Sequence, residues 1–213
     1  MRNRSMHRLI RVMLDGDSVQ AVDETRKLCN AGVKHEQIIS DGVEVAMNEL
    51  DTKCTSEQFN LLEIMLVGRT VMAVMKELYP QGSAPPQTKG TIVIGSLEGD
   101  VHDLGKNIFK MVLAGKGYRA VDCGRDCPVE TLIDTAEQEG AKAIGISGLI
   151  TTIIPQVCQV REKMMKRGLE HIKILAGGAT LKQATRESLN VDFVAETTFD
   201  GVRYLDQVLG RQK

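Results

Sequence analysis

From Thr91 onward the chain repeats one pattern five times: a short apolar run rich in β-branched residues, then a segment with helical periodicity. The five runs are TIVIGS, YRAVDCG, AKAIGISG, IKILAGG and VDFVAE, beginning at Thr91, Tyr118, Ala141, Ile172 and Val191. Neighbouring parallel strands need long crossover connections, which are usually helices. The alternation therefore predicts an α/β fold, a Rossmann-like five-stranded parallel sheet with helices on both faces. The last two helices are expected near 181–189 and 201–209.

Residues 1–79 have helical periodicity throughout and predict a four-helix bundle. The first helix carries Met6, Leu9, Ile10 and Met13 on one face. Asp15–Asp17 breaks it, Asp17 or Ser18 caps the second, and Gly32 ends the second. The third is expected from about His35 to Leu50. The fourth is expected to open with TSEQ, Thr55–Gln58, which resembles a capping box, and to run to Tyr79.

The stretch 80–90 holds three prolines and several small polar residues, which is typical of a linker. We therefore predict three parts: a helical domain at 1–79, a linker and possible hinge at 80–90, and the sheet domain at 91–213.

Composition argues against several classes of function. The formal net charge is −1, and aromatic residues make up 3% with no Trp, so neither a basic field nor a base-stacking surface is expected. No segment reads as a signal peptide or a membrane span, which predicts a cytoplasmic protein without nucleic-acid or membrane partners. The five cysteines form no CxxC pair and are expected to be reduced. Cys123 and Cys127 are expected to be thiols rather than zinc ligands.

The loop after the first strand, LEGDVHDLGKN, holds an unusual group of polar residues: Asp100, His102, Asp103 and Gly105. It has neither the dinucleotide fingerprint nor a Walker lysine pattern. In parallel α/β sheets ligands bind beyond the carboxyl ends of the strands. Other loops on that edge contribute a set of small and polar positions: Ser147, Leu149, Thr151, Thr152, Gly177 and Gly178.

His102 is the one histidine expected on that edge, whereas a protein-built structural metal site needs about four ligands. A lone histidine can instead be the axial ligand of a metal already held by a macrocycle. Asp100 could then accept the other ring N–H, which fixes the tautomer and raises the basicity of the ligand. Glycines would leave room for a long, thin portion of that ligand.

GDVHDLGKN, SGLITT and GG together resemble the cobalamin-binding signature D-x-H-x-x-G, S-x-L and G-G, on successive loops in the right order. With a helical domain in front, the chain resembles corrinoid proteins of methyltransferase systems and the cobalamin module of methionine synthase. The resemblance covers nearly the whole chain.

The resemblance implies cobalamin bound base-off and His-on, with its benzimidazole tail inserted into the sheet domain. His102 would be the cobalt ligand and Asp100 its hydrogen-bond partner. The remaining implied cofactor-binding residues are Asp103, Gly105, Ser147, Leu149, Thr151, Gly177 and Gly178. Asp103 is also explained as a charge favoured at a helix N-terminus. The helical domain would cover the upper corrin face around Phe59, Leu62 and Met65.

The implied function is that of a corrinoid methyl carrier without a catalytic residue of its own. Its partners would be a donor:corrinoid methyltransferase, a corrinoid:acceptor methyltransferase using tetrahydrofolate or a thiol, and a reductive activase. A cobalamin-dependent sensor or regulator, a mutase subunit, and a flavodoxin-like domain without a corrinoid are the alternatives. The helical domain has no basic face, and its presence favours methyl transfer over the mutase.

Three positions depart from the related patterns. Ile153 stands where the methionine-synthase pattern has a second serine, six residues after the first, that extends the hydrogen-bond chain from the aspartate. Leu62 replaces a proline common in related carriers. ATLKQAT follows Gly178 in place of the commoner APVT type of sequence.

Overall fold

The computed structural model describes residues 2–56, 60–80 and 89–210, and side chains at 2–3 and 54–56 are outside that description. Contacts divide the chain into a helical unit, Met1–Thr88 with Met111–Gly117, and a sheet unit, Lys89–Lys110 with Tyr118–Lys213. The predicted linker lies mostly in 81–88, which is not described.

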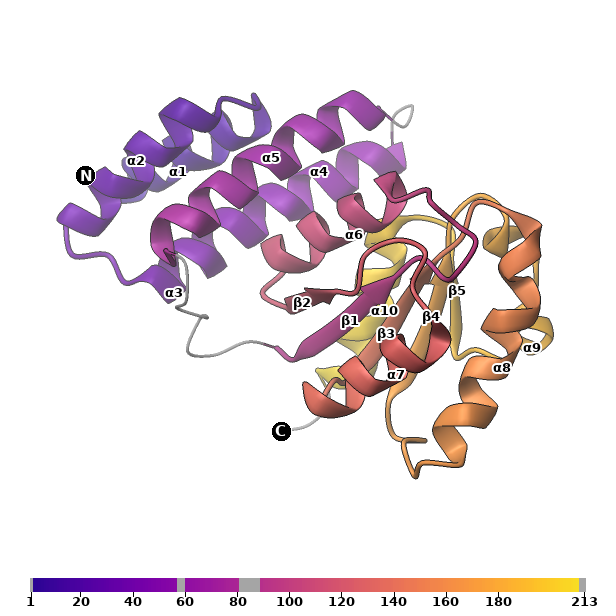
Figure 1. The fold of residues 1–213 in the computed structure, drawn as a ribbon. Coiled ribbons are helices and arrows are strands. Elements are labelled where there is room, and N and C mark those ends of the chain that lie inside the picture. The colour runs from indigo at the N-terminus through magenta and orange to yellow at the C-terminus, as the bar shows by residue number, and fades with distance from the viewer. Residues whose placement is uncertain (1, 57–59, 81–88, 211–213) are drawn as a thin grey trace. The chain divides into compact units, whose positions relative to one another are not determined.

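The helical unit is built from helices that pack side by side (Figure 1). Its elements are α1 (Arg2–Leu14), α2 (Ser18–Asn30), α3 (His35–Ile38), the π-helical segment η1 (Ile39–Val43), α4 (Glu44–Ser56) and α5 (Leu61–Leu78). Leu9 and Met13 of α1 and Val67, Val71 and Val74 of α5 are all buried, as amphipathic helices require. In the described ranges, no helix is both long and apolar enough to cross a membrane.

Two predicted helix boundaries agree with local geometry. The Asp17 side chain accepts hydrogen bonds from the Gln20 backbone N–H and from the Gln20 side-chain amide, at 2.9 and 2.8 Å, so it caps α2. Gly32 follows α2 with φ +75°, a left-handed conformation that glycine adopts without steric cost.

The predicted end of the third helix and the predicted start of the fourth are wrong, whereas the third begins at His35 and the fourth ends beside Tyr79 as expected. The third helical run does not stop at Leu50: α3, η1 and α4 continue one another from His35 to Ser56. Consequently Thr55 and Ser56 end a helix instead of opening one. Asn60 caps α5, its side chain accepting from the Glu63 N–H at 3.2 Å. The rest of TSEQ, and Phe59, lie outside the described residues.

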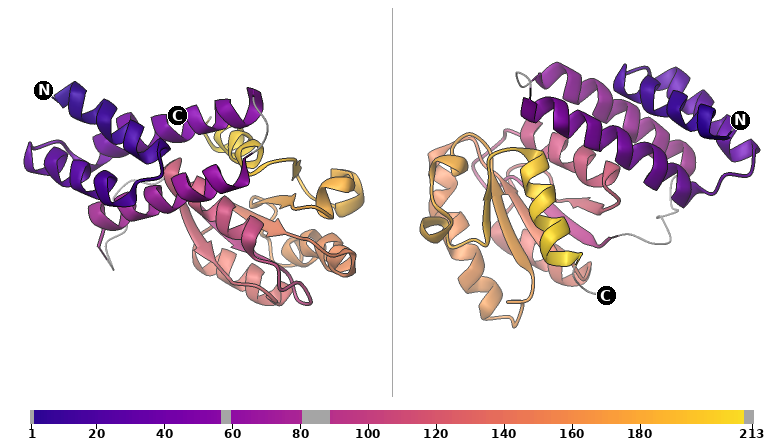
Figure 2. Two further views of the ribbon diagram at one scale, coloured as in Figure 1. Left: turned by 90° about the horizontal axis from the view of Figure 1, so that it is seen from above. Right: turned by 180° about the vertical axis from the view of Figure 1, so that it is seen from behind.

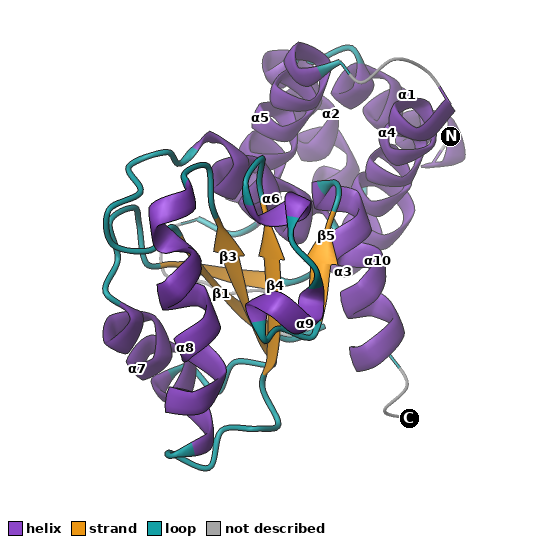
Figure 3. Ribbon diagram, turned by 90° about the vertical axis from the view of Figure 1, so that its right-hand side faces the viewer, coloured by secondary structure: helices purple, strands orange, loops and turns teal. Residues whose placement is uncertain are grey.

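The sheet unit contains five parallel strands in the order β2-β1-β3-β4-β5, which confirms the predicted fold class (Figure 3). The strands are β1 (Thr91–Gly95), β2 (Arg119–Asp122), β3 (Ala143–Ser147), β4 (Lys173–Gly177) and β5 (Phe193–Ala195). The chain moves outward from β1 in one direction to β2 and in the other to β3. The loops after β1 and β3 therefore leave the sheet side by side, at the switch point where such folds bind ligands.

Helices cover both faces of this sheet (Figure 2). They are α6 (Leu104–Gly115), α7 (Val129–Gln138), α8 (Ile154–Met165), α9 (Arg186–Leu189) and α10 (Thr198–Leu209). On one face, Leu132 and Ile133 of α7 and Val157 of α8 belong to a buried apolar cluster with the strands. On the other face, Phe109 of α6 packs against Gly145 of β3, so closely that a Cβ on this glycine would lie 2.9 Å from the phenyl ring.

The last two predicted helices differ from the structure. Residues 181–189 form two short pieces, the 3-10 turn η3 (Leu181–Gln183) and α9, because Thr185 is extended and begins α9 with a capping box shared with Ser188. The final helix begins at Thr198 rather than Gly201, since the Thr197 hydroxyl caps it through the Asp200 N–H at 3.0 Å.

Replacing the cap of α2 should destabilise the helical unit. We expect Asp17→Ala to lower the free energy of unfolding by about 1 kcal/mol, because the Gln20 N–H loses its acceptor. Asp15→Ala, which removes the same charge from the same turn, should change it by less than about 0.5 kcal/mol. Urea denaturation of both variants measures the difference, and equal losses would contradict the cap.

Candidate functional site

Asp100 is the most constrained side chain at the carboxyl edge of the sheet. It is fully buried in the loop that follows β1. Its Oδ1 accepts from the His102 N–H at 2.9 Å and lies 2.8 Å from the His102 Nδ1, and its Oδ2 accepts from the Leu149 N–H at 2.7 Å. Leu149 belongs to the loop after β3. One carboxylate therefore joins the two loops that leave the sheet at its switch point.

His102 is held on both its ring and its backbone. Because Nδ1 faces Asp100, Nε2 is directed away from the carboxylate, and half of the side chain, 51%, is exposed. The buried Ser96 hydroxyl donates to the His102 carbonyl at 2.9 Å. The result is an imidazole with one nitrogen engaged and the other available to a ligand. Sequence reasoning missed Ser96, whose one visible signal is its place at the end of β1.

The environment of Asp100 favours its ionised form. Burial raises the pKa of this carboxyl, but the hydrogen bonds from the Leu149 and His102 N–H groups and from the His102 ring lower it more, so the pKa lies below the ordinary value of 3.8. A carboxylate opposite Nδ1 accepts the proton of that nitrogen, so the neutral tautomer that it favours has its lone pair on Nε2.

The loop between β2 and α7 supports the Asp100 loop from its other side. The Asp126 side chain accepts from the Gly99 N–H at 2.7 Å, and the Asp126 N–H donates to the Asp100 carbonyl at 3.0 Å. Asp126 has φ 55°, so the chain turns sharply to make both contacts. Asp126 was not among the predicted site residues.

Gly105, Ser147 and Gly177 line up across the edge of the sheet. A Cβ on Gly105 would lie 3.4 Å from the Ser147 hydroxyl, so the first turn of α6 runs close to the end of β3. Ser147 pairs with Gly177 in the β3–β4 register. The structure therefore brings together residues from three strand ends that the sequence placed on one edge.

Gly178 is required by both space and backbone conformation. Its φ is +99°, and a Cβ there would be 2.5 Å from the Gly148 carbonyl oxygen. The Gly148 N–H donates to the Gly177 carbonyl at 2.9 Å. Thr180, which the sequence analysis overlooked, then donates its hydroxyl to the Leu149 carbonyl at 2.5 Å. The loops after β3 and β4 are thus packed backbone against backbone.

Two other predicted positions lie nearby without joining this network. Asp103 precedes α6, and its carbonyl accepts the helix's first bond from the Asn107 N–H at 2.8 Å, as a helix-terminal residue does. Thr151 is exposed and begins the 3-10 turn η2 (Thr151–Ile153). No hydrogen bond links Thr151 to Asp100 or His102 in the described part of the chain.

A buried ion pair ties the start of α6 to the end of β2. The Lys106 side chain is 3% exposed, and its Nζ lies 2.6 Å from Asp122, which also contacts Lys110 at 3.1 Å. Burial raises the pKa of Asp122, yet the bond from Lys106 and the Gly124 N–H lower it below 3.8 overall. This anchor holds the helix that follows His102, and the lysine's charge is compensated.

Large apolar side chains are exposed on the two loops that Asp100 joins and at the start of α6. Val101, Leu104 and Leu149 are 56%, 47% and 43% exposed, although all three are large and apolar. Exposed apolar side chains on these loops, together with a half-exposed imidazole, fit a large apolar ligand that offers a metal centre. No cluster of three or more His, Cys, Asp or Glu side chains within the described ranges is placed to hold a metal ion.

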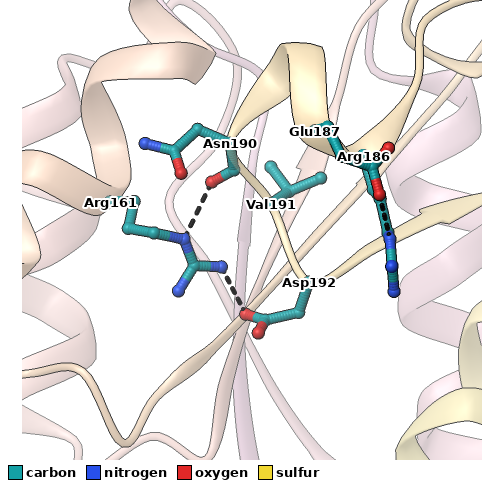
Figure 4. Close-up of a pocket in the computed structure, with 6 residues that line it drawn as sticks. All are labelled: Arg161, Arg186, Glu187, Asn190, Val191 and Asp192. Atoms are coloured by element: carbon teal, nitrogen blue, oxygen red, sulfur yellow. Dashed lines mark hydrogen bonds and ion pairs between the residues drawn. The ribbon is translucent and has the colours of Figure 1, made fainter.

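A separate hollow of about 290 Å³ lies at the opposite edge of the sheet (Figure 4). Arg161 reaches across it to Asp192 at 2.7 Å, and the Asp192 carboxylate also accepts from the Ile174 N–H at 2.8 Å. Asp192 precedes β5, which places the hollow at the amino ends of the strands. Its charges are paired with one another, and it is not part of the His102 site.

Comparison with known proteins identifies a family for the part of the chain that holds the site. The B12 binding domain family matches residues 90–203, which include every predicted site residue. Dimethylamine corrinoid protein 1 of Methanosarcina acetivorans is 34% identical over 81% of this chain and 83% of its own length. The dimethylamine corrinoid protein of Methanosarcina barkeri is 32% identical over 91% of both chains.

This chain belongs to the corrinoid protein family. Solved structures share its fold, among them the methanol:cobalamin methyltransferase complex MtaBC of Methanosarcina barkeri, with a TM-score of 0.86, 23% identity, and coverage of 100% of this chain and 82% of that one. A cobalamin-binding protein of Desulfitobacterium hafniense has a TM-score of 0.75 at 22% identity, covering 95% of this chain and 97% of that one.

In this corrinoid-family protein Asp100 pairs with His102, and its second oxygen has a backbone donor. Ile153, at the position of the second serine in the methionine-synthase pattern, is fully buried in the apolar cluster beneath α7 and α8. The Asp100 oxygen that does not face His102 is used by the Leu149 N–H instead. The donor to this second oxygen of Asp100 is therefore a backbone N–H and not the hydroxyl of a serine.

The close approach of Gly178 to Gly148 should make Gly178 intolerant of a side chain. We expect Gly178→Ala to lower the free energy of unfolding by more than about 3 kcal/mol, since the new Cβ meets backbone atoms that cannot move aside. Gly168→Ala is the matched control: its φ is +70°, but nothing lies within 4 Å. It should cost about 1 kcal/mol. Thermal and urea unfolding compare the two, and similar losses would argue against the steric explanation.

The hydrogen bonds to Asp100 should appear in the pH dependence of stability. Asp100→Asn should lower the free energy of unfolding by about 1–3 kcal/mol at pH 7, because an amide cannot accept from both loops. A folded-state pKa below 3.8 stabilises the protein above that pH and loses this contribution as the pH falls through the folded pKa. The difference from wild type should therefore shrink in acid. Asp103→Asn, which removes a carboxylate from the same loop but not the Leu149 bond, is the control for urea titrations at each pH.

Proposed function

We propose that this protein carries a methyl group on a corrinoid bound base-off and His-on, between a methyl-donor:corrinoid methyltransferase and a corrinoid:acceptor methyltransferase. The observation that carries this proposal is the buried Asp100 carboxylate holding Nδ1 of the exposed His102 within the B12-binding region. A bound corrinoid would supply the cobalt centre that accepts and releases the methyl group.

The protein's own contribution begins at the His102 Nε2, the nitrogen that would ligate cobalt. Asp100 orients the ring through Nδ1 and makes the imidazole more electron-rich, as carboxylate–histidine pairs do at metal sites. Ser96 holds the histidine backbone. Because ring and backbone are both fixed before a ligand arrives, little conformational entropy is lost when Nε2 binds.

Gly105, Ser147, Leu149, Thr151, Gly177 and Gly178 are proposed to line the channel for the cofactor's tail. Support comes from the loops after β3 and β4, where small residues let backbone approach backbone. Polar backbone groups and the Ser147 and Thr151 hydroxyls can bind a nucleotide-like tail there. Asp103 is proposed to act mainly through the N-terminus of α6.

The replacement of a relay serine by Ile153 suggests how ligand protonation is controlled. With Leu149 N–H on one Asp100 oxygen and His102 on the other, the carboxylate has its donors within the protein. We propose that the pair acts without the serine and that Asp100 stays ionised in the free protein.

The relatives named for dimethylamine make methylamines the first donors to test. Tetrahydrofolate or a thiol is the proposed acceptor, a reductive activase the proposed third partner, and the cytoplasm the proposed location. The function is tested by reconstituting the full chain with hydroxocobalamin, reducing it, and incubating it with a candidate donor methyltransferase and a labelled methylamine. Label that moves to the corrinoid and then to an acceptor supports the proposal. Binding of cobalamin without methylation by any donor system would favour a sensor.

Axial ligation by His102 can be tested apart from methyl transfer. We expect His102→Ala to bind hydroxocobalamin more weakly and with the visible spectrum of a water-ligated lower face, and added imidazole to restore much of the wild-type spectrum. His171→Ala, which changes an exposed histidine before β4, is the control. A wild-type spectrum for His102→Ala would rule out ligation by this residue.

A further inference from the structure

Cys123 and Cys127 lie at the two ends of the turn that supports the Asp100 loop, and neither has a role in the proposed cofactor site. Cys123 follows β2 and donates its N–H to the Ile94 carbonyl at 2.8 Å, continuing the ladder with β1. Cys127 forms a parallel bridge with Leu97. Both cysteines are therefore paired with the same stretch of chain, two residues apart along it.

The turn between them brings their side chains to one face. Gly124 and Asp126 both have positive φ, 85° and 55°, so the chain loops out for three residues and then resumes its direction along β1. The Cβ atoms of Cys123 and Cys127 lie 3.7 and 3.8 Å from the point that a Cβ on Gly95 would occupy. Leu132 Cδ1 is nearer still, at 3.0 Å, so both cysteines and Leu132 pack against Gly95.

Their spacing is within the range of a disulfide. Partners two residues apart on an extended chain are separated by about 6.6 Å. Disulfide-bonded cysteines usually have Cα atoms about 4.4–6.8 Å apart. Gly124, Arg125 and Asp126 are loop residues. Any movement needed to bring the two sulfur atoms together therefore occurs in this turn and not in the sheet.

The two thiols differ in reactivity. Cys123 is half-buried and Cys127 is buried. A hydrogen bond from the Cys127 thiol, against the effect of burial and with help from Thr135, lowers the pKa of Cys123 to about 7. The same contact with Cys123, followed by burial, raises the pKa of Cys127. Cys123 is thus the accessible, partly ionised thiol, and Cys127 the protected neighbour.

We propose that Cys123 and Cys127 form a redox dithiol that is reversibly oxidised to a disulfide by low-molecular-weight disulfides such as oxidised glutathione. The site is distinct from the corrinoid site and does not depend on the proposed function.

The exchange has two steps. The Cys123 thiolate attacks one sulfur of the small disulfide, forming a mixed disulfide and releasing one thiolate. Cys127 then gives up its proton to that thiolate and attacks the Cys123 sulfur, expelling the second thiolate, which takes a proton from water. The protein pair loses two electrons and two protons, and the oxidant becomes two thiols.

The turn that would close the disulfide also holds the loop that carries His102. Ser96 N–H donates to the Gly124 carbonyl at 3.1 Å, Glu98 N–H to the Cys127 carbonyl at 3.0 Å, and Cys127 N–H to the Ser96 carbonyl at 2.9 Å. With the two bonds of Asp126, these contacts join the dithiol's turn to the Asp100 loop.

The test uses the full chain without cobalamin, equilibrated with oxidised glutathione, then alkylated and mapped by mass spectrometry. We expect loss of two alkylatable thiols relative to the reduced protein, a peptide cross-linked between Cys123 and Cys127, and full recovery after dithiothreitol. Cys127→Ser should stop at a glutathione adduct on Cys123, whereas Cys158→Ser should behave as wild type. The wild-type map alone decides the matter if a variant does not fold. A lasting adduct on Cys123, or two unmodified thiols at 123 and 127, would overturn the proposal.

Discussion

The site depends on the burial of one carboxylate. An ionised Asp100 can be buried because three donors face its two oxygens, two from His102 and one from the Leu149 backbone. Those donors come from the loops after β1 and β3. The need of the Asp100 carboxylate for these donors therefore fixes how the two loops meet. As a consequence, Nε2 of His102 is directed away from the carboxylate.

Close backbone approach is the second constraint on the same edge. Gly178 touches Gly148, and Gly105 lies near Ser147, so the loops after three strands pack with almost no side chains between them. A side chain at Gly178 would push apart the loops after β3 and β4, and the first of these loops carries the Leu149 N–H that binds Asp100. Glycine at this edge therefore supports the hydrogen bonds of Asp100 and also leaves room for a ligand. These two roles do not conflict.

The loop after β2 acts as a support that faces away from His102. Its turn, closed by Gly124 and Asp126, gives hydrogen bonds to the Asp100 loop and keeps two thiols side by side beneath it. An apolar cluster under α7 and α8 holds this arrangement and includes Ile153, the residue that replaces a relay serine. Because the loop after β2 and the apolar cluster hold the Asp100 loop in place, the exposed His102 can keep one orientation.

The sequence by itself determined the five parallel strands and the pairing of Asp100 with His102. Hydrophobic alternation is a local signal, and two residues separated by one position are always near each other. It could not place the start of α5, since TSEQ resembles a capping box although its first two residues end α4, nor the break at Thr185 within 181–189. It also missed Ser96, Asp126 and Thr180. Tertiary structure decided these, and the use of the Leu149 N–H by Asp100, because a backbone donor from a distant loop has no signature in the residue that carries it.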